Sequence, residues 1–152
     1  MEYKEKEIEE MKFVGIGIDT SVQKSKEDCP VVWQEFMKNY KKIENYMGGM
    51  KNYGVAFEQS KDDCTFHYTA CAEVSDFGLI EEGMEKVQIP KSKCLVFIHK
   101  GKLDKLGETY WAITKELENK NIKAKPFWFE LYDKRWVGDL EKSEMEIWIP
   151  IE

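Results

Sequence analysis

Apolar and polar residues alternate in several short segments of the chain, which is the pattern of a β-strand with one buried face. The clearest of these segments covers residues 127–132 and follows Pro126. Successive side chains of a strand point to opposite faces, so each face of this strand has three residues. The residues predicted to face a core are Phe127, Phe129 and Leu131. The residues predicted on the other face are Trp128, Glu130 and Tyr132.

Two longer stretches repeat apolar residues every three or four positions, which is the spacing of an amphipathic helix. The first is predicted to begin at Asp28 as N-cap, with Pro30 in its first turn, and to end at Gly48 and Gly49. The second is predicted over residues 103–119. The other predicted strands cover residues 12–18, 53–58, 64–74, 94–99 and 144–150. The stretches predicted to lack such structure are the charged start, residues 1–10, and a loop, residues 75–86.

The predicted elements follow the order strand, helix, strand, strand twice within a single domain, residues 1–152. The first repeat would cover about residues 8–75 and the second about residues 88–152. Two βαββ units of this kind each bury one sheet face beneath a helix and leave the other face open. We therefore expect an α+β fold, in which the duplicated units form an antiparallel sheet with two helices on one face and a central ligand cleft on the other.

Acidic and aromatic side chains are predicted to gather on the cleft face. Burying a charged carboxylate costs several kcal/mol unless it is paired, and a cation that stacks on an aromatic ring gains roughly 0.5–2 kcal/mol per ring. Since the strands at 127–132 and 144–150 both carry an acid beside a ring, we favour a cage for a cationic aromatic molecule. The alternative is an exposed edge strand on which Glu130 is solvated. The candidate ligand-binding residues are His67, Glu73, Trp128, Glu130, Tyr132, Glu146 and Trp148.

The composition is that of a globular domain, with 42% hydrophobic and 13% aromatic residues among 152. A net charge of −6 with scattered basic residues argues against direct binding of DNA or other nucleic acid. The sequence has no apolar run that could span a membrane and starts with charged residues in place of a signal peptide, so we expect a cytoplasmic protein without membrane contact. Cys29, Cys64, Cys71 and Cys94 include no Cys-x-x-Cys pair. We expect reduced thiols, no metal site and no cofactor.

Eight short motifs in order resemble the GyrI-like small-molecule-binding domain, which is also the effector-binding domain of AraC- and MerR-type multidrug regulators. The motifs are Phe13-x-Gly-Ile with Thr20-Ser21, Trp33-Gln-Glu-Phe36, Tyr53-Gly54-Val55, Tyr68-x-Ala-x-Ala-Glu73-Val74, Gly83-Met84 with Ile89-Pro90, Val96-Phe97-x-His99-x-Gly101, Phe129-Glu130-x-Tyr132 and Glu146-Ile147-Trp148-Ile149-Pro150. The resemblance implies a duplicated βαββ fold and a buried glutamate for lipophilic cations, here Glu130. It also implies that Glu146 and Trp148 line the cleft.

Members of this family differ in what they do, so three functions stay open. The favoured one is a stand-alone binding module that captures lipophilic, aromatic or cationic compounds. The second is a hydrolase of cyclopropane-containing or similar toxins, in which Glu130 and Glu73 would form an acid–base pair and Tyr132 would donate a proton. The third is a protein that interacts with DNA gyrase or with a regulator. We expect a stand-alone member because the chain has no room for a helix-turn-helix domain.

Overall fold

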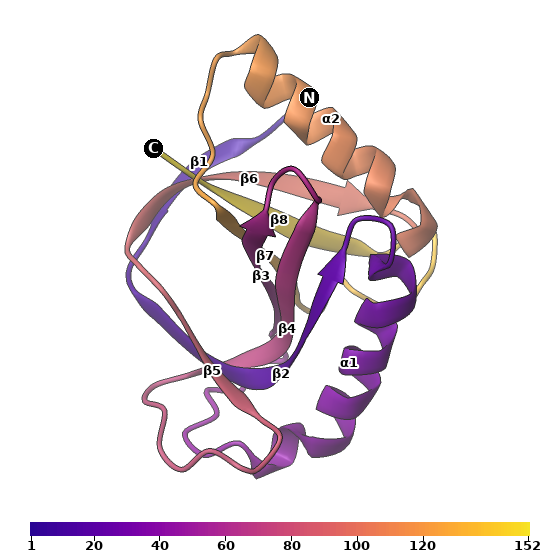
Figure 1. Ribbon diagram of the computed structural model, residues 1–152. Helices are drawn as coiled ribbons and strands as arrows, with labels where there is room; N and C mark the ends of the chain where they lie inside the picture. Colours follow the sequence, from indigo (N-terminus) through magenta and orange to yellow (C-terminus); the bar gives the residue numbers. More distant parts are fainter.

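A computed structural model describes residues 1–152 as a curved eight-stranded sheet with both α-helices on one side (Figure 1). The strands are β1 (Lys4–Ile8), β2 (Met11–Ser21), β3 (Asn52–Ser60), β4 (Thr65–Val74), β5 (Glu85–Ile89), β6 (Ser92–Lys100), β7 (Phe127–Tyr132) and β8 (Glu144–Ile151). The helices are α1 (Ser25–Asn39) and α2 (Leu106–Asn119), with 3-10 turns η1 (Tyr40–Lys42) and η2 (Leu103–Lys105). All strand pairs are antiparallel. The predicted α+β class is confirmed.

The strand order is symmetric about the centre of the sheet. It runs β1-β6-β8-β7-β3-β4-β2-β5, so β7 and β3 are the central pair. On either side of that pair the order is the second, third and first strand of a βαββ unit. The two halves of the chain therefore meet where β3 and β7 pair, from Asn52 opposite Tyr132 to Phe57 opposite Phe127.

Two long bent strands connect the halves on the side away from the helices (Figure 1). β1 leads into β2, and β5 leads into β6. Each bent strand pairs with both halves, because β1 pairs with β6 and β5 pairs with β2. The sequence predicts a solvated start over residues 1–10 and a loop over 75–86, and it misses β1 and β5. β1 lacks a core-facing pattern because it is an edge strand, in which every residue except Ile8 is exposed.

The helices cover the sheet face that contains Glu130. α1 buries Val32 and Phe36 against β2, β3 and β4, and α2 buries Ile113 against β6 and β8. Trp128 packs against both of these clusters. α1 begins at Ser25, before the predicted N-cap, and residue 28 lies inside the helix.

A second core fills the reverse face of the sheet, inside the bent strands. Its buried members are Phe13, Tyr53, Val55, Cys71, Val87, Ile89, Phe127, Phe129 and Leu131. The predicted core face of residues 127–132 is thus confirmed. The four cysteines are free thiols. Neither helix has the length and apolar character that crossing a membrane requires.

Candidate functional site

Glu130 occupies the middle of the sheet on β7, between Gly54 of β3 and Ile147 of β8. Only 5% of its surface is exposed. Because Ile147 packs under α2, Glu130 lies on the helix-covered face. The sequence places the cleft on the face opposite the helices, whereas the structure places this carboxylate beneath them.

Three tyrosine hydroxyls donate hydrogen bonds to the Glu130 carboxylate. Tyr68 of β4 and Tyr132 of β7 donate to Oε1 at 2.9 and 3.0 Å, and Tyr110 of α2 donates to Oε2 at 2.6 Å. The Tyr68 oxygen in turn accepts a hydrogen bond from Nε1 of Trp33 on α1, at 2.9 Å. Both halves of the chain and both helices thus contribute to one hydrogen-bond network.

Gly54 makes this network sterically possible. A Cβ at this position would overlap the hydroxyl of Tyr68 and would lie 2.9 Å from Oε1 of Glu130. Contacts this short do not occur for real Cβ atoms. The missing side chain therefore leaves the path along which Tyr68 reaches across β3 to the carboxylate.

The carboxylate lacks a positively charged partner, since none of the ion pairs in the structure includes Glu130. Burial raises the pKa of Glu130 above its ordinary value, and the three tyrosine hydrogen bonds, together with a smaller effect of the nearby His99, oppose that rise. Burial, and then the nearby charge of Glu130, raises the pKa of Tyr68, Tyr110 and Tyr132 well above the usual range. The phenols therefore stay protonated and act as donors.

Aromatic rings surround the carboxylate between the two helices. The Tyr132 ring packs edge-on against Trp33 of α1 and against Trp136 in the β7–β8 loop, with both centroid distances 5.1 Å. Trp128 packs against Phe66 at 5.4 Å. Trp33, Trp128, Tyr132 and Trp136 are all partly exposed, in contrast to the buried carboxylate. The arrangement is a charged centre within an aromatic wall that solvent reaches in part.

The structure brings three of the seven predicted site residues together and separates the other four from them. Trp128, Glu130 and Tyr132 share the helix-covered face, as predicted. The residues on the reverse face are His67, Glu73, Glu146 and Trp148. Strand pairing is the reason, since Trp148 lies opposite Phe129, a reverse-face residue, and stacks on its ring with centroids 5.3 Å apart. The prediction that all seven share one face is therefore wrong.

Three of the reverse-face residues have polar partners there. His67 contacts Asp19 through Nδ1 at 2.7 Å and Glu85 through Nε2 at 2.9 Å. Glu146 accepts a hydrogen bond from Nε1 of Trp148 at 2.9 Å and pairs with Arg135. The His67 contacts join β4 to β2 and to β5, and the Arg135 contact joins β8 to the β7–β8 loop, on the side of the sheet away from Glu130.

Sequence reasoning missed Tyr68, Tyr110, Trp33 and Gly54 as parts of this site. Tyr68 and Tyr110 both lie on faces that pack in the core. The signal that could have identified them is the hydroxyl. A tyrosine at a core-facing position needs a partner for its O–H, and phenylalanine needs none.

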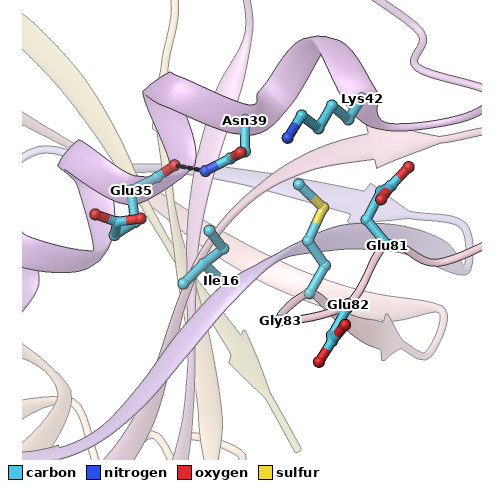
Figure 2. Close-up of a pocket in the computed structure, with 8 residues that line it drawn as sticks. Ile16, Glu35, Asn39, Lys42, Glu81, Glu82 and Gly83 are labelled. Carbon is cyan, nitrogen blue, oxygen red and sulfur yellow. Dashed lines mark hydrogen bonds between the residues drawn. The ribbon is translucent and has the colours of Figure 1, made fainter.

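A polar pocket lies on the other flank of α1, away from Glu130 (Figure 2). Its lining residues are Ile16, Glu35, Asn39, Lys42, Glu81, Glu82, Gly83 and Met84. Asn39 turns its amide back to the carbonyl oxygen of Glu35, at 2.8 Å. Three glutamates and one lysine line this pocket, and it contains no aromatic ring. We therefore place the candidate site at Glu130, where aromatic rings surround a buried carboxylate.

Comparison with known proteins identifies the family of this chain. The family model described as Cass2, integron-associated effector binding protein, matches residues 6–151. The transcriptional regulator BrlR of Pseudomonas aeruginosa is 32% identical over 123 residues. The aligned part is 79% of this chain and 45% of BrlR, so the chain spans less than half of that relative.

Solved structures show the same fold. SAV2435 bound to tetraphenylphosphonium superposes with a TM-score of 0.77 at 20% identity, over 100% of this chain and 94% of that one. The integron cassette protein VCH_CASS2 from the mobile metagenome of Vibrio cholerae has a TM-score of 0.68 at 16% identity, over 99% and 95% of the two chains. The match over residues 6–151 shows that the chain belongs to the Cass2 family of effector-binding proteins, which agrees with the resemblance to the GyrI-like effector-binding domain.

Proposed function

We propose that this protein binds lipophilic organic cations between α1 and α2, with Glu130 as the counter-charge. The observation that carries the proposal is a buried carboxylate that takes part in no ion pair and is surrounded by aromatic rings. The solved structure of SAV2435 with tetraphenylphosphonium supports it, because a protein of the same fold binds a cation of this class.

The physical argument rests on compensation of charge. An ionised carboxylate in an apolar site is costly, and the tyrosine hydrogen bonds offset only part of that cost. A cation with aromatic groups supplies the missing charge and packs against the rings, at roughly 0.5–2 kcal/mol for each cation–π contact. A lipophilic cation also loses little hydration on entering, since its charge is spread over a large apolar body.

The proposed contact residues differ from the set derived from the sequence. We retain Glu130, Trp128 and Tyr132. We add Trp33, Tyr68, Tyr110 and Trp136 from the hydrogen-bond network and the aromatic wall. The four reverse-face residues are left out because the sheet lies between them and the carboxylate.

The same geometry disfavours the hydrolase alternative in its two-glutamate form. Glu130 and Glu73 are on opposite faces of the sheet, so they cannot act on one bond as an acid and a base. Glu73 also has its own neighbours, since Tyr53 and Lys51 lie near its carboxylate. Binding without chemistry is the function that the arrangement supports best.

The proposal predicts a specific pH dependence. Tetraphenylphosphonium does not titrate, so any change of affinity with pH must come from the protein. Burial raises the pKa of Glu130 in the unliganded protein, and the cation favours the ionised form. Affinity should therefore be highest above the raised pKa and should fall by up to about tenfold per pH unit below it. Isothermal titration calorimetry between pH 8 and pH 4.5 measures the fall.

Glu130→Gln is the matched control for this titration, because it keeps the shape of the side chain and cannot ionise. Its affinity should be low and nearly independent of pH. A wild-type affinity that is flat over this range would contradict the role of Glu130. Undetectable binding by wild-type protein at every pH, with a folded circular dichroism spectrum, would contradict the ligand class.

A further inference from the structure

We propose that Arg135 is a positioning residue that holds Trp136 against Tyr132, so that the β7–β8 loop forms one wall of the cation site. This inference rests on the proposed function, since it concerns the same site. It connects Glu146 and Trp148, which lie on the reverse face, to the aromatic wall on the helix-covered face.

The Arg135 side chain joins two carboxylates at the base of the loop. It binds Asp133 in a bidentate manner, with Nε 2.9 Å from Oδ1 and Nη2 2.7 Å from Oδ2. Nη2 also lies 2.9 Å from Oε2 of Glu146. The carboxylate side chains are only 19% and 13% exposed, so the contacts are weakly screened by solvent. The guanidinium lowers the pKa of Asp133, which keeps that side chain charged.

Glu146 is a rigid anchor for this bridge. Its other oxygen, Oε1, accepts the hydrogen bond from Nε1 of Trp148. The Trp148 ring stacks on Phe129 with an interplanar angle of 14°. The sheet core on the reverse face therefore fixes the carboxylate to which Arg135 attaches.

Trp136 follows Arg135 directly and lies in the wall of the proposed site. Its backbone N–H donates to the carbonyl oxygen of Asp133 at 2.9 Å, which closes a tight turn. Its ring meets Tyr132 at an interplanar angle of 85°. The Tyr132 hydroxyl in turn donates to Glu130. The turn that Arg135 holds therefore fixes the position of the Trp136 ring against the tyrosine that contacts the carboxylate.

Other contacts hold the rest of the loop without Arg135. Oγ of Ser143 accepts a hydrogen bond from the N–H of Val137 at 3.1 Å and itself donates to the carbonyl of Gly138. Asp139 accepts a hydrogen bond from the N–H of Leu103 at 2.7 Å. Replacing Arg135 should thus release Trp136 without unfolding the loop.

The test is a cycle of four proteins: wild type, Arg135→Met, Trp136→Ala and the double variant. Methionine keeps much of the length of the arginine and removes its charge. Arg135→Met should weaken tetraphenylphosphonium binding by about 2- to 12-fold, the range for one aromatic contact. In the Trp136→Ala background the same change should have no further effect. Equal weakening in both backgrounds would overturn the inference, because Arg135 would then act by another route.

A matched control and a second measurement separate this inference from the proposed function. Lys134→Met removes the same charge from an exposed neighbour and should leave binding unchanged. In protein labelled with 5-fluorotryptophan, the fluorine resonance of Trp136 is identified by its loss in Trp136→Ala. This resonance should shift in unliganded Arg135→Met and should stay unchanged in unliganded Lys134→Met. If wild type fails to bind the cation, the proposed function is wrong and the fluorine spectrum still tests the clamp. An unchanged Trp136 resonance would overturn the inference.

Glu146→Gln provides a milder variant if Arg135→Met does not fold. It removes one charge from the bridge and keeps a group that can accept the Trp148 hydrogen bond. It should shift the Trp136 resonance in the same direction by a smaller amount. Absence of that shift in a folded protein counts against the clamp as well.

Discussion

Replacing Glu130 with glutamine is expected to weaken tetraphenylphosphonium binding by about 1.5–3 kcal/mol, the scale of a charge-assisted contact. That is about a 10- to 150-fold loss of affinity. The reason is that the cation completes the charge balance of a carboxylate that has three hydrogen-bond donors and no ion-pair partner. Calorimetric titration of wild type and variant at pH 8 measures the difference.

A neutral probe and a stability measurement show whether charge is the cause. Triphenylphosphine oxide carries three of the same rings without a net charge, so the substitution should change its binding far less. Burial raises the pKa of Glu130, so the folded wild type gains a proton more readily than the unfolded chain and loses stability as pH rises through that pKa. The stability of the Glu130→Gln variant should not fall with rising pH in this way. Equal weakening of both probes would mean that Glu130 shapes the site and does not recognise charge.

Gly54→Ala is expected to cause the largest loss of stability. The new methyl group would overlap the Tyr68 hydroxyl and press on Glu130. Extra volume in a packed core typically costs about 1–3 kcal/mol, and the hydrogen bond to Glu130 that Tyr68 would lose is worth about 1.5–3 kcal/mol. We expect the free energy of unfolding to fall by at least about 2 kcal/mol, and cation binding to weaken as well. Urea denaturation followed by circular dichroism measures the first effect.

Gly107→Ala is the matched control, because it is the same chemical change in a different setting. Gly107 lies in α2, and a Cβ there would have no atom within 4 Å. Alanine in an exposed helical position should raise stability by about 0.4–1 kcal/mol. Opposite signs for the two variants would locate the effect at the Tyr68–Glu130 contact. A Gly54→Ala protein as stable as wild type would contradict the steric argument.

The alternation of residues in a strand was enough to predict which side chains of β7 share a face. The burial pattern of the strand agrees, with Phe127, Phe129 and Leu131 in the reverse-face core. Alternation cannot predict which face of one strand continues on the next, because that depends on register between distant segments. Trp148 shows the limit: its own strand alternates as predicted, yet its pairing with Phe129 puts it behind the site.

The hydrogen-bond network around Glu130 lay beyond sequence reasoning for a related reason. Tyr68 and Glu130 are 62 residues apart, and their contact depends on the pairing of β3 with β4 on one edge and with β7 on the other. The apolar spacing of α2 predicted the helix but not that Tyr110 would point its hydroxyl at a carboxylate. The local spacing of apolar residues determines which segments form helices and strands. The tertiary arrangement of those helices and strands determines which polar side chains meet.

The exchange of edge strands between the halves limits how a ligand can enter. The halves are joined by three separate sets of ladder hydrogen bonds, at β1–β6, β2–β5 and β3–β7. Opening the molecule like a clamshell would break all three at once. A cation that binds as proposed would therefore have to reach Glu130 while the sheet stays whole, through displacement of side chains and of the two helices that lie over the sheet. The speed of entry should depend on how freely Trp33 and Trp136 move, and the sheet should act as a fixed floor.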